Sequence, residues 1–422
     1  MPDVIVIGAG PAGLALGCYL ARSGIDHVIV DRAVHPRPHV GESLLPATVE
    51  ILDEIGFLPV MEAAGFPRSG GIVYHSLERK RPIEVPYGTF PQRGAIRDHT
   101  YHVDRAKFDM LLMKHADGLG CRILLGAKVE EVLFDPALRA RGVRVVVGGE
   151  QVEMEARIVV DAAGRNTLIG SQLGLRNDYG HLDQMALHAW FVGVDRGRKS
   201  TSDYTHVYFL PSPRGWAWRA SISADITSVG LVVDRSSYAS ASGPVAFFEK
   251  RIAENPALAE AMRDAERIND LKGETSYAYR LRRICGDGWL AVGDAARFLD
   301  PVFSSGVCVA LQGARLGART IEDALSRDDT SRGAFLPYEE GVFAVADVWD
   351  DFMDLYYKLH QSFTHFVRST DYRPGILRLL QGRVARRAEA PVLDAIRDFV
   401  ESVETTDGHP LRGALTGLRL EG

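Results

Sequence analysis

Cysteine is scarce in this chain, and its cysteines do not cluster. Only four of the 422 residues are cysteine, namely Cys18, Cys121, Cys285 and Cys308. This scatter excludes a disulfide-stapled scaffold and provides no pair at the spacing of a zinc site. We therefore expect no bound metal, a reducing compartment and a cytoplasmic protein.

Long apolar runs and an excess of positive charge are missing as well. No stretch of about 18 uninterrupted apolar residues exists to span a bilayer, and the first apolar run predicts a strand rather than a signal peptide. A formal net charge of −6 disfavours nucleic acid as a partner. With 46% hydrophobic and 25% charged residues, the chain is typical of a globular protein, and its length predicts two closely packed domains.

The N-terminal segment has the pattern of a dinucleotide-binding site. A short β-branched run breaks into G-x-G-x-x-G and then continues as a helix. Gly8 allows a tight turn, Gly10 lets the backbone approach a pyrophosphate, and Gly13 lets the helix pack closely on the strand. The helix N-terminus then faces the phosphate charge. A second apolar run ends at Asp31, at about the 20-residue separation expected for a carboxylate that binds ribose.

The remaining periodicity predicts an α/β protein with an inserted sheet. Strand-like and helical runs alternate up to about residue 180, with helices over 47–55 and 105–118. Alternating patterns then predict an antiparallel sheet with strands over 185–194, 206–210, 215–223 and 228–234. Residues 244–267 are expected to be helical, 288–292 to form an apolar strand, and the segment after Phe335 to be helical.

Two further strand ends carry a carboxylate followed by small residues. One apolar run leads into Asp161, Ala163 and Gly164, and another leads into Gly293 and Asp294. Small residues permit close approach of a ligand, and a carboxylate at the carboxyl end of a strand can accept hydrogen bonds from ribose or ribityl hydroxyls. Either turn alone is common in α/β proteins. Together with the N-terminal site they form a three-part pattern.

This three-part pattern resembles that of FAD-dependent monooxygenases over about 300 residues. The resemblance implies FAD as the cofactor, with Asp31 at the adenosine ribose and Asp294 at the ribityl chain. Arg105 also matches the family pattern, although a surface charge at a helix start is the alternative interpretation. The cofactor-binding residues that the resemblance implies are Gly8, Gly10, Ala12, Gly13, Asp31, Arg32, Arg105, Asp161, Ala163, Gly164, Gly293, Asp294, Gly306 and Val307.

The implied architecture is α/β. It consists of a Rossmann-type FAD-binding domain with an inserted antiparallel β-sheet substrate domain and a C-terminal helical segment. We expect the discontinuous FAD-binding domain to cover residues 1–75, 98–180 and 275–330. The substrate domain is expected over residues 76–97 and 181–274, and the helical region over residues 331–422.

Two segments resemble flavin-dependent halogenases more specifically. Gly41-Glu42-Ser43 is similar to a G-E-S segment beside the isoalloxazine, and residues 298–307 match the F-x-x-P-x-x-S-x-G element of halogenases acting on phenols or carrier-tethered pyrroles. Such a loop can present backbone N–H groups that stabilise reduced flavin or hold a small anion. Burial would raise the pKa of Glu42 and favour proton handling, unless Glu42 is a structural carboxylate. The predicted catalytic residues are Glu42, Ser43, Pro301, Ser304, Ser305 and Gly306.

The chain departs from the halogenase pattern at one position. Halogenases of this kind carry a lysine downstream of the G-E-S segment, whereas residues 65–72 contain none. Arg68 is the nearest cation and, being permanently protonated, is a poor substitute for a reactive amine. Lys80 lies further on, in a charged run expected to face solvent. The pair Trp216 and Trp218 resembles part of the second halogenase signature, and we interpret it as core packing.

Without this lysine, the chain is similar to the flavoprotein monooxygenases of tryptophylquinone biogenesis. We therefore predict an FAD-dependent monooxygenase in which a flavin C4a-hydroperoxide passes oxygen from O2 to an indole or phenol ring. The substrate is an aromatic small molecule, a carrier-tethered group or a tryptophan of a partner protein. The alternatives are a flavin-dependent halogenase of an aromatic substrate and a non-catalytic flavoprotein or partner-binding module.

The source of electrons stays open at the level of sequence. The chain contains one G-x-G-x-x-G element, so it has no separate nicotinamide domain. FAD would be reduced by NAD(P)H directly or by a separate flavin reductase. We expect neither nucleic acid nor a membrane as a partner. His75, His188 and His206 fall in the predicted substrate region, where a histidine is more often a packed residue than a catalyst.

Overall fold

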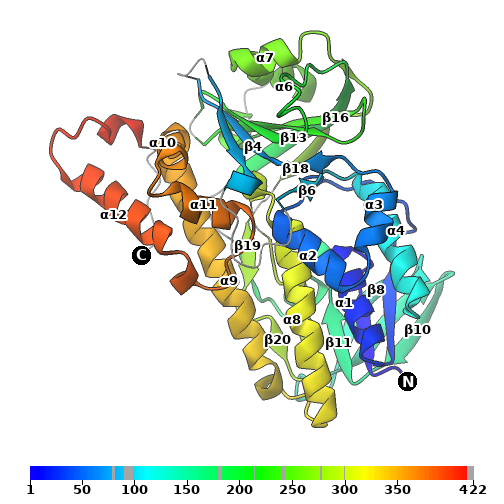
Figure 1. Ribbon diagram of the computed structural model, residues 1–422. Coiled ribbons are helices and arrows are strands. Elements are labelled where there is room, and N and C mark those ends of the chain that lie inside the picture. Colours follow the sequence, from blue (N-terminus) through cyan, green and yellow to red (C-terminus); the bar gives the residue numbers. More distant parts are fainter. Residues whose placement is uncertain are drawn as a thin grey trace.

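A nucleotide-binding α/β unit lies next to a large β-sheet, and long C-terminal helices run along one side of both (Figure 1). The structure, a computed structural model, describes residues 1–77, 81–89, 98–178, 183–212, 214–238, 243–275, 278–298 and 300–415.

The α/β unit is built on a six-stranded sheet in which β1 (Val4–Ile7) is central. All adjacent pairs are parallel except the pair formed by β20 and β21. Both faces of this sheet are covered, which explains why its inner strands are continuous β-branched runs. The other strands, from one edge to the other, are β20 (Cys285–Gly286), β21 (Trp289–Ala291), β11 (Ile158–Asp161), β2 (His27–Asp31) and β7 (Arg122–Leu125).

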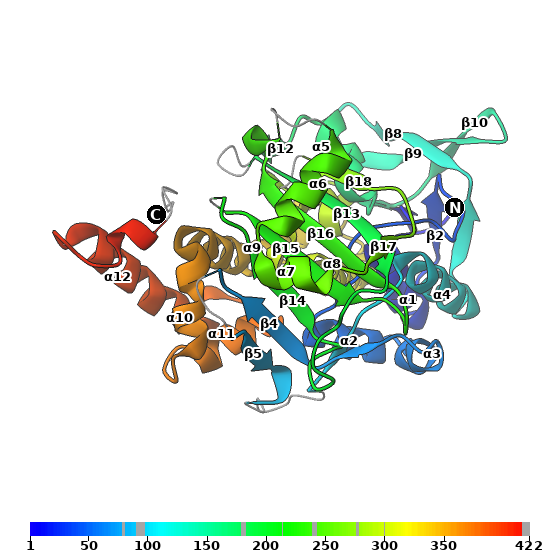
Figure 2. The same cartoon turned by 90° about the horizontal axis from the view of Figure 1, so that it is seen from above.

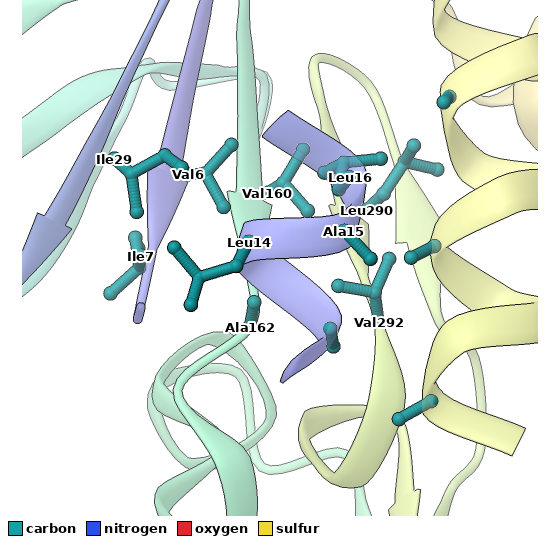
Figure 3. Packing of buried hydrophobic residues seen from close by; sticks show 14 of the residues in the cluster. Val6, Ile7, Leu14, Ala15, Leu16, Ile29, Val160, Ala162, Leu290 and Val292 are labelled. Atoms are coloured by element: carbon teal, nitrogen blue, oxygen red, sulfur yellow. The ribbon is translucent and has the colours of Figure 1, made fainter. Parts of the chain in front are cut away.

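Helix α1 (Pro11–Arg22) packs directly against this sheet and against helix α8 (Gly306–Ser326). Figure 3 shows Leu14 and Ala15 of α1 beside Val160 of β11 and Val292 after β21, and all four side chains are buried. Helix α4 (Arg105–Gly118) also packs on α1, and Asp104 caps it by accepting a hydrogen bond from the Ala106 N–H at 2.9 Å.

The large sheet is mixed rather than fully antiparallel. Its strand β4 pairs in parallel with β14, and β4 begins at Gly71, inside the range assigned from sequence to the FAD-binding part. In order across the sheet, its strands are β17 (Glu266–Arg267), β13 (Gln184–Val192), β16 (Thr227–Asp234), β15 (Trp216–Ser221), β14 (Thr205–Phe209), β4 (Gly71–His75) and β5 (Ile83–Pro86), with β18 (Lys272–Thr275) also paired to β13.

Two short helices, α6 (Pro244–Ala253) and α7 (Pro256–Ala261), cover the outer face of the large sheet (Figure 2). The single helix predicted over residues 244–267 is therefore wrong. The helix breaks because Pro256 has no N–H group to continue α6 and Asn255 is the N-cap of α7. The last part of the range forms β17. The inner face of the sheet points toward the α/β unit.

Smaller elements connect these two parts of the fold. Two short helices follow β2, a three-stranded sheet flanks the nucleotide-binding unit, and further short pairs join the segments around residues 68, 101, 176 and 280. Their bounds are α2 (Pro46–Glu54), α3 (Leu58–Ala63), β3 (Arg68–Ser69), β6 (Thr100–Tyr101), β8 (Lys128–Phe134), β9 (Ala140–Val147), β10 (Glu150–Glu155), α5 (Leu168–Gln172), β12 (Arg176–Asp178), β19 (Tyr279–Leu281) and β22 (Arg297–Phe298).

The C-terminal helices supply an aromatic core. They are α9 (Arg332–Leu359), α10 (Phe363–Arg368), α11 (Arg373–Leu380) and α12 (Pro391–Thr405). Phe352 of α9 stacks on Phe303 with ring centroids 3.9 Å apart, which joins α9 to the segment that precedes α8. No helix within the described ranges combines the length and the apolar content needed to cross a bilayer.

We predict that Phe352→Ala destabilises the protein by about 3–5 kcal/mol, because it removes a fully buried ring and leaves a cavity beside Phe303. Urea unfolding of the purified protein measures this loss. Phe399→Ala serves as the control and should cost much less, because Phe399 is only half-buried. Equal losses in the two variants would show that the Phe303 contact does not support the fold.

Candidate active site

The three predicted turns meet at one edge of the parallel sheet. Ile7, the last residue of β1, is in register with Val30 of β2 and Asp161 of β11. Because parallel strands end at the same edge, the glycine turn after β1 lies at the same edge of the sheet as Asp31 at the end of β2, Asp161 at the end of β11 and Asp294 after β21.

The glycines of the first turn have different structural tasks. Gly8 has a φ of +110°, and a Cβ there would lie 2.4 Å from the Ala162 carbonyl oxygen. A Cβ on Gly13 would lie 2.0 Å from the Gly8 carbonyl oxygen, so both glycines are required by packing. A Cβ on Gly10 would meet only the Arg37 guanidinium, at 3.5 Å. The Gly10 backbone is thus open to a ligand at the N-terminus of α1.

Arg37 is a candidate phosphate-binding residue that the sequence analysis missed. Its guanidinium lies beside Gly10, and its Nε is buried without a hydrogen-bond partner among the described residues. Arg32, which the resemblance had implied, is exposed. No sequence signal distinguishes the two arginines, because only the path of the loop after β2 brings Arg37 back to the glycine turn.

Asp31 ties the glycine turn to β2. Its Oδ2 accepts a hydrogen bond from the Ala9 N–H at 2.6 Å, and its Oδ1 accepts one from the Ala33 N–H at 2.7 Å. The Asp31 carboxylate therefore holds the loop that would carry the pyrophosphate. Its contact with a ribose stays a prediction.

Asp161 and Asp294 have similar sequence contexts but different surroundings. Asp161 is fully buried and accepts hydrogen bonds from the Ala163 and Ile169 N–H groups, at 3.0 and 2.8 Å, which close its own turn. The Asp294 carboxylate accepts no hydrogen bond from the part of the protein that the structure describes. Burial raises the pKa of each carboxyl to about 6. Asp294 is therefore the carboxylate available to a ligand.

Arg105 is buried, so its interpretation as a surface charge is wrong. Its guanidinium forms two hydrogen bonds with Asp109, at 2.9 and 3.1 Å, and a third with the Val40 carbonyl oxygen at 2.8 Å. Asp294 and Glu42 lie close enough to add to the stabilisation of its charge. Arg105 thus fixes the segment before Glu42, and its direct contact with a cofactor stays a prediction.

An open glycine backbone, a free carboxylate and a buried arginine together suit FAD. Gly10 and the N-terminus of α1 would receive the pyrophosphate, with Arg37 beside them. Asp294 would accept hydrogen bonds from the ribityl hydroxyls. The donor set of this edge of the sheet therefore matches the cofactor that the sequence implies.

Glu42 faces the inner face of the large sheet. The Trp190 indole N–H donates to its Oε1 at 2.7 Å, and the Ser228 hydroxyl donates to its Oε2 at 3.0 Å. Burial raises the pKa of Glu42, and these two hydrogen bonds oppose the rise. Ser228 in turn accepts from the Trp218 indole N–H at 3.2 Å. The sequence analysis missed Trp190 and Ser228.

Trp218 lies across Gly230, where a Cβ would be only 2.3 Å from the indole ring. Trp216 and Trp218 are on the same face, with ring centroids 5.7 Å apart. His188 is also on this inner face, with its ring centroid 6.1 Å from that of Trp218. The two tryptophans therefore pack behind the Glu42 segment.

Ser43 belongs to a second buried polar cluster. Its hydroxyl and the His102 Nε2 both lie 2.9 Å from the Thr205 hydroxyl. Burial lowers the pKa of His102 to about 4, so this imidazole is neutral at pH 7. The sequence analysis did not identify His102 or Thr205.

His75 and His206 lie on the other face of the sheet. They contact each other at 2.9 Å, and His75 stacks on Tyr208 with ring centroids 4.2 Å apart. Tyr208 packs with Leu187 in the apolar layer under α6 and α7. They are therefore packed residues on the large sheet, because the alternation along β4 and β14 turns them away from the Glu42 segment.

The segment before α8 forms a tight turn at the start of that helix. Pro301 begins a 3₁₀ turn capped by Asp300, Ser304 has a φ of +54°, and Ser305 is the residue before the helix. The helical hydrogen bonds begin where the Val309 N–H donates to the Ser305 carbonyl oxygen at 2.9 Å. The amides that precede Val309 in the first turn therefore have no intrahelical acceptors. This geometry can stabilise an anion. Leu299 lies outside the described residues.

The segment in which the lysine is absent contains the short strand β3, where Arg68 is exposed and Ser69 is buried. Ser69 is fully buried and its hydroxyl donates to the Gly71 carbonyl oxygen at 3.4 Å. Arg68 is exposed and pairs with Glu62 at 3.9 Å. Lys80 lies outside the described residues. Neither Ser69 nor Arg68 thus presents an amine to this site.

The chain matches the FAD binding domain family over residues 1–338. It is 37% identical over 426 aligned positions to a 1H-pyrrole-2-carbonyl-(peptidyl-carrier protein) chlorinase from Pseudomonas fluorescens, covering 96% of this chain and 95% of that protein. It is 29% identical to the corresponding brominase from Pseudoalteromonas luteoviolacea, with 90% and 91% of the two chains covered.

The structure is similar to that of the flavin-dependent brominase Bmp2, with a TM-score of 0.86 and 27% sequence identity. The superposition covers 96% of this chain and 99% of the brominase. The predicted α/β class with an added sheet and C-terminal helices is confirmed.

We predict that Asp294→Asn weakens FAD binding at pH 7.5 by about 1–3 kcal/mol, because the ionised carboxylate is the stronger acceptor for ribityl hydroxyls. In the wild type, FAD affinity should fall as the pH drops through the Asp294 pKa of about 6. The variant should lose this part of the pH dependence. FAD titrations from pH 5 to 8 measure both effects, and identical profiles for the two proteins would contradict the assignment.

Proposed function

The chain belongs to the FAD-binding-domain family, in the superfamily of FAD-dependent halogenases and monooxygenases, and from this membership we propose that it is a flavin-dependent halogenase. Its proposed substrate is an electron-rich heteroaromatic acyl group, such as pyrrole-2-carbonyl, carried on a peptidyl carrier protein. The observation that carries the proposal is the 37% identity to a chlorinase of that substrate, which extends over 96% of this chain.

The predicted monooxygenase activity is wrong. Two relatives that match almost the whole chain are a chlorinase and a brominase, so the halogenase alternative has the better support. The error came from the lysine missing in residues 65–72. A missing side chain at one position does not exclude a reaction, because a folded site collects its groups from several segments.

FAD, once bound and reduced, would supply the oxidising equivalent from O2 that turns a halide into an electrophile. The protein's own contribution is positioning and electrostatics. Gly10, Arg37 and Asp294 bind the cofactor, and the first-turn amides of α8 stabilise a nearby anion. Buried aromatic side chains on the inner face of the sheet exclude water. Electrons come from NAD(P)H directly or from a separate flavin reductase.

Glu42 is the proposed proton acceptor. Electrophilic substitution replaces a ring hydrogen by halogen, so the ring must release a proton. Burial raises the pKa of the Glu42 carboxyl, which makes its carboxylate a stronger base. Trp190 and Ser228 hold the two carboxylate oxygens in place. Arg105 fixes the backbone before it.

The activity is tested with a carrier protein loaded with a pyrrole-2-carbonyl group, in the presence of FAD, a flavin reductase, NADH, O2 and chloride or bromide. Mass spectrometry should show that one ring hydrogen is replaced by halogen, and that this product disappears when halide is omitted. Gly10→Asp should abolish product, because its carboxylate repels the pyrophosphate. Halide-independent addition of oxygen to the ring, or no product with either halide, would contradict the proposal.

We predict that Glu42→Gln lowers kcat by about 100-fold or more with FAD still bound, because it removes the proton acceptor. Ser228→Ala removes a hydrogen bond that stabilises the ionised carboxylate and so raises the pKa of Glu42 further. The acidic limb of its pH–rate profile should therefore move to higher pH. Stopped assays over pH 5–9 measure both effects, and a Glu42→Gln enzyme of normal kcat would refute the role.

A further inference from the structure

Two buried polar atoms beside the aromatic core around Phe303 have no partner among the described residues. The Asp300 Oδ2 and the Tyr356 hydroxyl have no hydrogen-bond partner within the described ranges. Asp300 is 3% exposed and Tyr356 is 0% exposed, so solvent does not satisfy them. Buried polar groups are nearly always paired in folded proteins, so an unpaired acceptor and an unpaired donor in one region are available to a bound water or ligand.

The Asp300 carboxylate is held rigidly by its other oxygen. Oδ1 accepts hydrogen bonds from the Val302 N–H at 2.9 Å and from the Tyr357 hydroxyl at 2.8 Å. Tyr357 in turn accepts from the Trp216 indole N–H at 3.1 Å. These contacts fix the carboxylate between β15 and α9 and leave Oδ2 as a preoriented acceptor.

The Tyr356 ring joins the same aromatic cluster. Its centroid lies 5.2 Å from that of Phe303 and 5.4 Å from that of Tyr357. Phe303 follows Asp300 by three residues in the sequence, and Tyr357 is hydrogen-bonded to Asp300. Phe363 and Phe209 pack on it at 5.1 and 6.0 Å. Burial, Tyr74 and the Asp300 carboxylate, in that order, raise the pKa of Tyr356, so its hydroxyl stays protonated and can donate a hydrogen bond. An aromatic cluster of this kind suits a flat ring.

The position of Asp300 links this cluster to the cofactor site. Asp300 lies between the Asp294 turn and the first turn of α8, so the segment that carries it runs from the proposed ribityl contact to the proposed anion site. Phe303, three residues later, is fixed by the stack on Phe352. The aromatic cluster and the Asp294 turn are therefore joined by one short segment of the chain.

We propose that Asp300 and Tyr356 are specificity-determining residues that recognise one edge of the heteroaromatic acyl substrate. The Asp300 Oδ2 accepts a hydrogen bond from the ring N–H, and the Tyr356 hydroxyl donates one to the acyl carbonyl oxygen. This inference rests on the proposed function. In a pyrrole-2-carbonyl group the N–H and the carbonyl occupy adjacent positions, so one donor and one acceptor lie on the same edge of a flat molecule. A carboxylate on the N–H also raises the electron density of the ring, which favours attack by an electrophile.

The test measures binding to the oxidised, FAD-loaded enzyme, so it does not depend on turnover. The probes are pantetheine thioesters of pyrrole-2-carboxylate, N-methylpyrrole-2-carboxylate and furan-2-carboxylate, titrated by calorimetry. The wild type should bind the pyrrole probe about tenfold or more tightly than the other two, because these leave the carboxylate unpaired. Asp300→Asn keeps an oxygen for Val302 and Tyr357 but presents an amide donor in place of Oδ2. It should lose the preference for pyrrole and favour furan.

Tyr356→Phe should weaken binding of the pyrrole probe about tenfold and leave the melting temperature unchanged, because the hydroxyl has no partner to lose. Tyr338→Phe is the matched control, since the Tyr338 hydroxyl is equally buried but donates to the Ala291 carbonyl oxygen at 2.7 Å. It should lower the melting temperature and leave probe binding unchanged.

The two proposals fail in different ways. The recognition proposal is overturned if the wild type binds the three probes equally. It is also overturned if Asp300→Asn and Tyr356→Phe both keep the wild-type preference for the pyrrole probe. Either result counts even when the carrier assay shows halogenation. The predicted reversal between pyrrole and furan supports recognition even when that assay shows no halogenated product. In the latter case only the proposed function fails.

Discussion

The close approach of α1 to the parallel sheet is the constraint on which the site depends. Gly13 has no side chain because a Cβ would lie 2.0 Å from the Gly8 carbonyl oxygen, and the Ala9 N–H binds the Asp31 carboxylate at 2.6 Å. These contacts aim the N-terminus of α1 at the carboxyl ends of the strands. Because α8 packs on α1, the same approach positions the first turn of α8 and the Asp294 turn. The cofactor, halide and substrate contacts proposed here all start from this arrangement.

The cofactor side and the substrate side are built by different physical means. Main-chain turns at strand ends form the cofactor side, where glycine and carboxylate chemistry follow from local geometry. The proposed substrate side is an aromatic core between the large sheet and α9, in which a few polar groups are held in place by neighbouring side chains. Glu42 is held by Trp190 and Ser228, and Asp300 by Tyr357. Burial raises the pKa of both carboxyls, so each is adjusted by its surroundings rather than by its sequence context.

The correction of the predicted chemistry illustrates how the two kinds of information differ. The absence of lysine from residues 65–72 is a true property of the sequence, but similarity along almost the whole chain to carrier-dependent halogenating enzymes outweighs it. The residue at one motif position describes the chemistry of one segment only. The inner face of the sheet, the G-E-S loop and α9 form the surroundings of Glu42 and Asp300, and these segments are distant in the sequence.

The sequence sufficed to predict the glycine turn, the turns at Asp161 and Asp294, the α/β class and the start of α8, because each depends on residues a few positions apart. It did not reveal that Asp161 closes its own turn whereas Asp294 stays open, nor that Arg37 returns to Gly10. The partners of Glu42 are 148 and 186 residues away, and the Asp300 partner Tyr357 is 57 residues away. These contacts could not be predicted from local periodicity, because strand pairing and helix packing bring such distant side chains within hydrogen-bonding distance.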